Sequence, residues 1–294
     1  MQVMLYDSLV DLDSEWDVVF RGENVDHRDL ETGKWLKDRC RELKILHYDR
    51  NEMHLVINDE IVELYDLCDY FIGADGKSFL IDSTSLGIAE LAILTVELEK
   101  AGISAFDVIY AEPSEYRHDS MHGERVFNLS SEMLGFEEAG IPGISRAVRR
   151  DEPRLFIFLM GYESERFRNA LEISDLSPEE SNLIFGIPGF KFGWDKYSFL
   201  SNARPIMEYG LENSLLFCGA NNICGVYRTL CEMRKKHQDE TFFIVPLGPK
   251  PMSLGALRFL CKDHNSSLLY DHASKSRNGS SGIGKIHLAR GFLS

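Results

Sequence analysis

The chain lacks the features that mark secreted and membrane proteins. Its most apolar runs, such as Leu155–Gly161, are too short to span a bilayer. The first residues show no basic region followed by an apolar run, so we expect no signal peptide. None of the six cysteines forms a Cys-x-x-Cys pair, which is typical of free thiols in a reducing compartment. The sequence therefore predicts a cytoplasmic protein with no membrane partner.

Positive charge is also scarce. The chain contains 32 Lys and Arg residues but 47 Asp and Glu residues, which gives it a net charge of −15. Proteins bind duplex DNA or RNA mainly through clustered Lys and Arg, so we expect no duplex nucleic acid as a partner. A small anionic ligand stays open, because a few converging N–H groups and a nearby cation are enough to bind it.

Common catalytic and nucleotide-binding signatures are absent or incomplete. No Gly-x-Ser-x-Gly elbow occurs and no Gly-x-Gly-x-x-Gly fingerprint follows a strand, which argues against a serine hydrolase and an ordinary dinucleotide dehydrogenase. Gly279–Lys285 has the spacing of a P-loop, but Ile286 stands where a Ser or Thr would hold magnesium. We expect a loop there, followed by a final strand at Lys285–Ala289.

The densest group of possible metal ligands contains His118, Asp119 and His122, inside the polar segment Pro113–Glu124. No other histidine cluster accompanies it in the sequence, and such residues in a polar loop are usually solvated. We therefore predict a long loop over Pro113–Glu124 and no metal site. The sequence identifies no cofactor.

The second half of the chain alternates between short apolar runs and helical patterns. Runs that are apolar throughout predict strands covered by helices on both faces. The predicted strands are Leu155–Met160, Asn182–Ile187, Ser214–Cys218, Thr241–Val245 and Ser267–Tyr270. The predicted helices are Ser164–Ile173, Lys196–Tyr209, Ile223–His237 and Met252–Asp263. This order predicts right-handed crossovers and a mostly parallel sheet.

The first half is less regular. Its predicted strands are Trp16–Phe20, Leu43–Tyr48, Met53–Ile57, Phe79–Ile81 and Phe106–Tyr110. Its predicted helices are Arg28–Arg41 and Leu86–Lys100, with Ile61–Phe71 as helix or strand. The charged segment Arg146–Pro153 predicts a boundary between an N-terminal α/β unit at 1–148 and a C-terminal Rossmann-like α/β unit at 149–294. The fold class is thus α/β, with a mostly parallel, doubly wound, Rossmann-like sheet. The sequence leaves open whether the chain consists of two tandem α/β units related to each other.

The most informative passage is the turn Pro246–Gly255, where an apolar strand enters a helix through a Gly/Pro loop. Such a turn gathers backbone N–H groups at a helix N-terminus, which favours anions such as phosphate. We predict that Gly248, Lys250 and Ser253 cradle phosphate, with an exposed lysine in a tight turn as the alternative. The similar turn Asp82–Gly87 offers a second set of candidates, for which helix capping is the alternative. These are Ser83, Thr84 and Ser85.

Further candidates follow the other predicted strands of the second half, because ligands of open parallel sheets bind beyond the carboxyl ends of the strands. Glu163 and Arg166 are predicted to orient the ligand. Asn221 and Asn222 carry amides that can read the polar part of a nucleotide, and a turn with a helix N-cap is the alternative.

The loop Pro246–Leu254 resembles the signature loop of the CARF family, the CRISPR-associated Rossmann-fold sensors of cyclic oligonucleotides. That loop reads approximately Thr-Gly-Gly-Thr-Lys-x-Met-Ser after a strand. The residues that match it are Gly248, Lys250, Met252 and Ser253. Pro249 replaces the usual threonine and Leu247 a glycine, so the loop is stiffer with one hydroxyl fewer. The resemblance implies a Rossmann-like fold and nucleotide sensing.

The leading hypothesis is a protein that binds a nucleotide or another phosphorylated small molecule, in a sensor or regulatory role. The first alternative is a nucleotide-processing enzyme of phosphodiesterase or glycosidase type, in which Glu163, Asp271 or His272 supplies acid/base catalysis. The second alternative is a non-catalytic interaction subunit of a larger complex. The sequence leaves a homodimer or another protein partner open.

Overall fold

The computed structural model describes residues 1–294 except 72–75, 122–123, 133–134, 137–139 and 278. The chain divides into two compact units. Unit 1 consists of Met1–Arg117 and Lys275–Ser294, and unit 2 consists of His118–Ser274. This division differs from the predicted boundary at residue 148. The C-terminal strand pairs with two strands of unit 1 and so belongs to it. Residues 118–148 belong to unit 2, where Ser130 and Arg146 donate backbone hydrogen bonds to Glu163 and Ser267.

Unit 2 is built on a five-stranded parallel sheet with the order β13-β12-β11-β14-β15. Its strands are β11 (Arg154–Met160), β12 (Ser181–Gly186), β13 (Leu215–Cys218), β14 (Thr241–Pro246) and β15 (Ser266–Leu268). Its helices are α4 (Ser164–Ser174), α5 (Asp195–Glu208), α6 (Ile223–Lys236) and α7 (Lys250–Lys262). The predicted alternation of strands and helices is confirmed here, with bounds that differ by a few residues at most.

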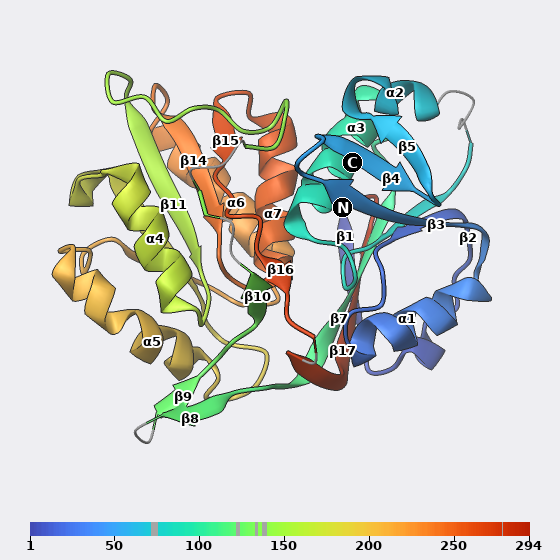
Figure 1. The fold of residues 1–294 in the computed structure, drawn as a ribbon, viewed down its shortest axis with the longest axis horizontal. Helices are drawn as coiled ribbons and strands as arrows, with labels where there is room; N and C mark the ends of the chain where they lie inside the picture. Colours follow the sequence, from blue (N-terminus) through green and yellow to red (C-terminus); the bar gives the residue numbers. More distant parts are fainter. Residues whose placement is uncertain (72–75, 122–123, 133–134, 137–139, 278) are drawn as a thin grey trace. The chain divides into compact units, whose positions relative to one another are not determined.

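Helices cover both faces of this sheet (Figure 1). Phe156 and Phe158 of β11 pack with α4 and α5, whereas Leu155 and Ile157 of the same strand pack with α6 and α7. Burying each such side chain contributes about 1.5–3 kcal/mol, so both faces of the strand stabilise the unit. This two-sided burial explains why β11 is apolar from Leu155 to Met160 instead of alternating.

Unit 1 contains an eight-stranded sheet with the order β1-β17-β7-β6-β2-β3-β4-β5. Its strands are β1 (Gln2–Tyr6), β2 (Trp16–Arg21), β3 (Cys40–Asp49), β4 (His54–Ile57), β5 (Glu60–Glu63), β6 (Phe79–Asp82), β7 (Asp107–Tyr116) and β17 (Ser280–Arg290). Its helices are α1 (His27–Lys37), α2 (Leu67–Tyr70) and α3 (Ile88–Lys100). The four central strands β7, β6, β2 and β3 are parallel, and the outer strands join them antiparallel, so the sheet is mixed.

The predicted long loop at Pro113–Glu124 is wrong. β7 continues to Tyr116, and the short strands β8 (Asp119–Met121) and β9 (Glu124–Val126) follow. Proline is tolerated in a strand at a bulge, and β17 shifts its register just after the residue that pairs with Pro113. The predicted final strand at Lys285–Ala289 is confirmed as part of the longer β17.

Other predicted elements of the first half need smaller corrections. The predicted helix Arg28–Arg41 is too long, since α1 ends at Lys37 and β3 begins at Cys40. Ile61–Phe71 contains strand first and helix afterwards, in β5 and α2. The remaining short strands are β10 (Ser130–Glu132) and β16 (Ser274–Lys275).

A buried ionic cluster ties the C-terminal segment to the start of α1 within unit 1. Asp26 and Asp29 form a capping box at the N-terminus of α1. The Nζ of Lys275 lies 2.7 Å from Asp29 and 3.0 Å from Asp26. Arg28 lies 3.1 Å from Asp26 and donates to the hydroxyl of Ser280 at 2.9 Å. The cluster thus joins residues from the two separate segments of unit 1.

The charges of this cluster compensate for the cost of burying it. Burial alone would raise the pKa of Asp26, but the charges of Arg28 and Lys275 and the hydroxyl of Ser280 outweigh it and hold this pKa well below its usual value. Asp26 therefore stays ionised at neutral pH and keeps its cationic partners in place.

Replacing Lys275 by Met should lower the free energy of unfolding by about 3 kcal/mol, because Asp26 and Asp29 would stay buried without their ammonium partner. Lys285→Met on β17 is the matched control, since Lys285 lies 4.0 Å from Asp7 in a solvent-exposed pair. Urea unfolding curves compare the two variants. Equal loss of stability in both would contradict a structural role for the cluster.

Candidate functional site

The carboxyl ends of β11 and β14 lie side by side in unit 2, because these two strands are parallel neighbours. β12 and β13 lie on one side of β11, and β14 and β15 extend the sheet on the other. Successive strands are therefore added on one side of β11 up to β13, and then on its other side from β14 onward. We call the place between β11 and β14, where the strand order reverses, the reversal point. Ligands of open α/β sheets bind in the crevice at such a place.

Two glycines let the backbone segments approach closely at the reversal point. A Cβ added to Gly161 would lie 1.9 Å from the carbonyl oxygen of Leu247. A Cβ added to Gly248 would lie 2.7 Å from the carbonyl oxygen of Met160. Both distances are too short for real atoms, so a side chain at either position would force the loops apart. The glycines thus hold the loop before α7 against the end of β11.

α7 begins at the reversal point with Pro249 at its N-cap and Lys250 as its first residue, without a side-chain cap or an acidic residue in the first turn. The positive end of its dipole is therefore not neutralised by a carboxylate of that turn. Backbone donors are fewer than the sequence suggested. Pro251 has no N–H, and Met252 and Ser253 donate to the Pro249 carbonyl at 3.0 and 3.4 Å.

The hydroxyl of Ser253 is the unusual group at this helix start. Ser253 is 1% exposed, and its Oγ has no hydrogen-bond partner within the described part of the chain. Side chains in a helix are tilted toward its N-terminus, so this hydroxyl is directed toward the first turn of α7. A buried hydroxyl without a partner costs about 1–3 kcal/mol, and an acceptor or donor on a ligand would recover that energy.

Glu163, Arg166 and Asp271 come together in unit 2. Arg166 donates to both oxygens of Asp271 at 2.6 and 2.7 Å and lies 3.5 Å from Glu163. Burial alone would lower the pKa of the Arg166 guanidinium, but its hydrogen bonds with Asp271 and the charge of that carboxylate raise this pKa above its usual value. Glu163 also accepts hydrogen bonds from the backbone N–H groups of Leu129 and Ser130 at 2.9 and 2.8 Å. These side chains therefore bind one another and the preceding segment.

The segment that Glu163 binds also packs its aromatic residue on the end of β11. Phe127 stacks on Tyr162 with ring centroids 4.6 Å apart and lies 5.6 Å from the ring of Tyr197 in α5. Nothing in the sequence pattern assigned a role to these aromatic residues, because they are far apart along the chain. The one local signal is that Tyr162 directly follows Gly161.

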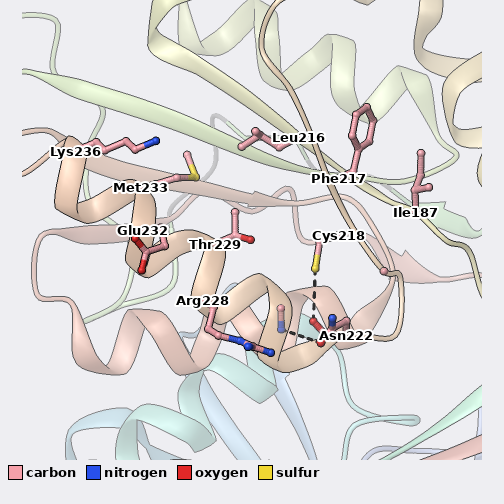
Figure 2. A pocket seen from close by; sticks show the side chains of 12 residues that line it. Ile187, Leu216, Phe217, Cys218, Asn222, Arg228, Thr229, Glu232, Met233 and Lys236 are labelled. Carbon is pink, nitrogen blue, oxygen red and sulfur yellow. Dashed lines mark hydrogen bonds between the residues drawn. The ribbon is translucent and has the colours of Figure 1, made fainter.

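Asn222 caps α6, since its side chain accepts a hydrogen bond from the N–H of Gly225 at 2.8 Å (Figure 2). This is the helix-capping alternative stated for the Asn pair. Asn221 is half-buried in the same turn. β12 separates β13 from β11 in the sheet. The start of α6 nevertheless packs closely on α7, since a Cβ added to Gly255 would lie 2.5 Å from the carbonyl oxygen of Ile223.

Ser83, Thr84 and Ser85 are buried at the carboxyl end of β6 in unit 1. Ser83 donates to the backbone of β7 at 2.7 Å and Ser85 donates to Asp82 at 2.8 Å. Thr84 accepts from the backbone of β7 at 3.0 Å. The carboxylate of Asp82 lies 3.6 Å from the guanidinium of Arg21. Asp82 therefore neutralises the positive charge that Arg21 could otherwise offer to an anion at this turn. An anion site at this turn stays a prediction.

The histidine candidates do not form a common site within the described residues. His272 is buried, with its ring centroid 5.2 Å from that of Tyr270. His122 lies outside the described residues, and Asp119 accepts a hydrogen bond from Asn128 at 3.0 Å. Where the structure describes the chain, no group of three or more His, Cys, Asp or Glu residues is arranged to hold a metal ion.

None of the helices among the described residues has both the length and the apolar character needed to cross a membrane. Comparison of the chain with models of known protein families and with curated proteins returned no match.

Gly161→Ala should destabilise the protein by about 3 kcal/mol, because the new methyl group would overlap the Leu247 carbonyl. Gly219→Ala is the matched control after β13, where the nearest atom to an added Cβ is the side-chain oxygen of Asn221 at 3.5 Å. Thermal unfolding of both variants measures the difference. A Gly161→Ala variant as stable as Gly219→Ala would contradict the close approach at the reversal point.

Proposed function

We propose that the protein binds a nucleotide or another small phosphorylated molecule at the reversal point, and that it acts as a sensor or regulator. The observation that carries this proposal is the buried, unpartnered hydroxyl of Ser253 at the start of α7. The uncapped helix end and the half-buried Lys250 add positive charge at the same place. Together they supply a cation, a dipole and a hydroxyl to an anionic ligand.

A Rossmann-like assignment of unit 2 supports the position of this site. Counted along the chain, the strands of its parallel sheet have the order 3-2-1-4-5, with helices on both faces. Doubly wound nucleotide-binding folds share this order and place the phosphates at a helix N-terminus beside the reversal point. The fold analogy supports the class of ligand and does not identify the ligand.

The resemblance of Pro246–Leu254 to the CARF loop also favours a nucleotide. In that family of cyclic-oligonucleotide sensors the matching Gly, Lys, Met and Ser positions belong to the signature loop. Here Pro251 and Pro249 leave the first turn of α7 with few backbone donors, so Lys250 and Ser253 carry more of the binding than N–H groups do. We therefore expect affinity to depend strongly on these two side chains.

A sensor role is favoured over an enzyme because two of the three candidate acid/base groups, Asp271 and Glu163, are engaged elsewhere. Asp271 forms two charge-assisted hydrogen bonds with Arg166, and Glu163 accepts three hydrogen bonds from Leu129 and Ser130. Proton transfer by either carboxylate would break these contacts. If the protein is instead a phosphodiesterase or glycosidase, it should turn over at least one nucleotide of a panel. A sensor without catalytic groups should bind the nucleotide and leave it chemically unchanged.

Lys250→Ala should weaken binding of the tightest ligand in a nucleotide panel by about tenfold or more, because it removes the cation nearest the helix start. The panel contains mononucleotides, cyclic nucleotides and inorganic phosphate, and calorimetric titration measures affinity. Lys262→Ala removes the same charge from the other end of α7 and should leave affinity unchanged. Equal affinity of the Lys250→Ala variant and the native protein would remove Lys250 from the site.

Ser253→Ala should have opposite effects on stability and on binding. Without ligand, the variant should be as stable as the native protein or more stable by about 1 kcal/mol, because it removes a buried hydroxyl that has no partner. Its affinity for the same ligand should fall about tenfold, since the ligand loses a hydrogen bond. Thermal unfolding with and without ligand measures both effects. Loss of stability with unchanged affinity would show that Ser253 serves the core instead.

A further inference from the structure

A groove runs beside the open edge of the unit 2 sheet, away from the reversal point. It has a volume of about 610 Å³ and lies between β13 and α6 (Figure 2). The strand contributes Leu216 and Phe217 to its lining, and the helix contributes Arg228, Met233 and Lys236. The groove thus combines a strand edge, apolar side chains and cations.

The edge of β13 offers backbone groups for pairing. β13 is the last strand of its sheet, with β12 on its inner side. The carbonyl oxygens of Ser214 and Cys218 accept from the N–H groups of Leu183 and Ile187 in this ladder. Because backbone groups alternate in direction along a strand, those of Phe217 point to the outer side. An extended chain that enters the groove can therefore add to the sheet as another strand.

The side chains near β13 favour a partner that places an apolar residue beside this strand. Phe217 is 58% exposed, although it is a large aromatic residue. Leu216 and Ile187 are half-buried, and Met233 is buried on the helix side. A partner that covers Phe217 would remove apolar surface from water and gain affinity from it.

The charge of the groove differs from that of the whole chain. Arg228 and Lys236 are both exposed and line the groove, whereas the chain has a net charge of −15. Glu232 is the one acidic residue in the lining, and its carboxylate forms an ion pair with Lys235 at 2.6 Å. The groove therefore presents net positive charge to a partner, and it is complementary to acidic side chains.

We propose that this groove binds an extended, acidic segment of a partner protein, which pairs with β13 as an added strand. Alternate side chains of such a strand point to opposite faces. Acidic side chains on one face contact Arg228 and Lys236, and an apolar side chain covers Phe217. The proposal concerns a separate surface from the α7 site, so each can fail without the other.

The test uses the full chain and a fluorescein-labelled peptide of alternating Val and Glu, with fluorescence anisotropy as the readout. Two matched peptides separate the contributions: one has Lys in place of Glu, and one has the same side chains with N-methylated backbone. We expect both to bind at least about tenfold more weakly, because the first loses charge complementarity and the second loses strand pairing.

Protein variants locate the binding surface. Arg228→Glu and Phe217→Ser should each weaken binding of the Val/Glu peptide by about tenfold or more, and both residues are exposed, so the fold should be retained. Arg204→Glu makes the same charge change on α5, outside the groove, and should bind as the native protein does. Equal binding of all peptides, or an unaffected Arg228→Glu variant, would overturn the proposal. Sedimentation that shows a dimer abolished by Phe217→Ser would also overturn it, because a second copy would then occupy the groove.

Discussion

The close approach of Gly161 to the Leu247 carbonyl is the constraint on which the proposed site depends. It holds the end of β11 against the loop that precedes α7, with Gly248 making the reciprocal contact to the Met160 carbonyl. Because β11 and β14 are parallel neighbours, their carboxyl ends meet at this contact. The first turn of α7, with Lys250 and Ser253, is thereby placed where the sheet order reverses, and its positive dipole end is directed at the same place.

The fold of unit 2 could be predicted from the sequence because its signals are local. Strands such as β11 and β14 are apolar after their first residue, and helices such as α6 and α7 repeat their buried residues with helical spacing. The turn at Pro246–Gly255 could be identified in the same way, since strand, glycine and helix follow one another in the chain. Asn222 also behaves as local rules describe, because an asparagine before a helix is a common N-cap.

The features that the sequence did not predict depend on contacts between distant residues. β17 joins the sheet of unit 1 through pairing with β7 and β1, which no local pattern reveals. Lys275 reaches Asp29, a member of the capping box of α1, across 246 positions of the chain. The pairing of Arg166 with Asp271 is equally distant. Arg166 was predicted to orient a ligand and Asp271 was an acid/base candidate, and the structure shows that the two side chains bind each other.

Hydrogen exchange of the native protein with and without its tightest nucleotide ligand tests the central claim most directly. If the ligand binds at the start of α7, exchange of the backbone amides of Lys250, Met252 and Ser253 should slow on binding, while that of Ser83–Ser85 in unit 1 stays unchanged. Slower exchange confined to Ser83–Ser85, or none at the start of α7 under saturating ligand, would contradict the account.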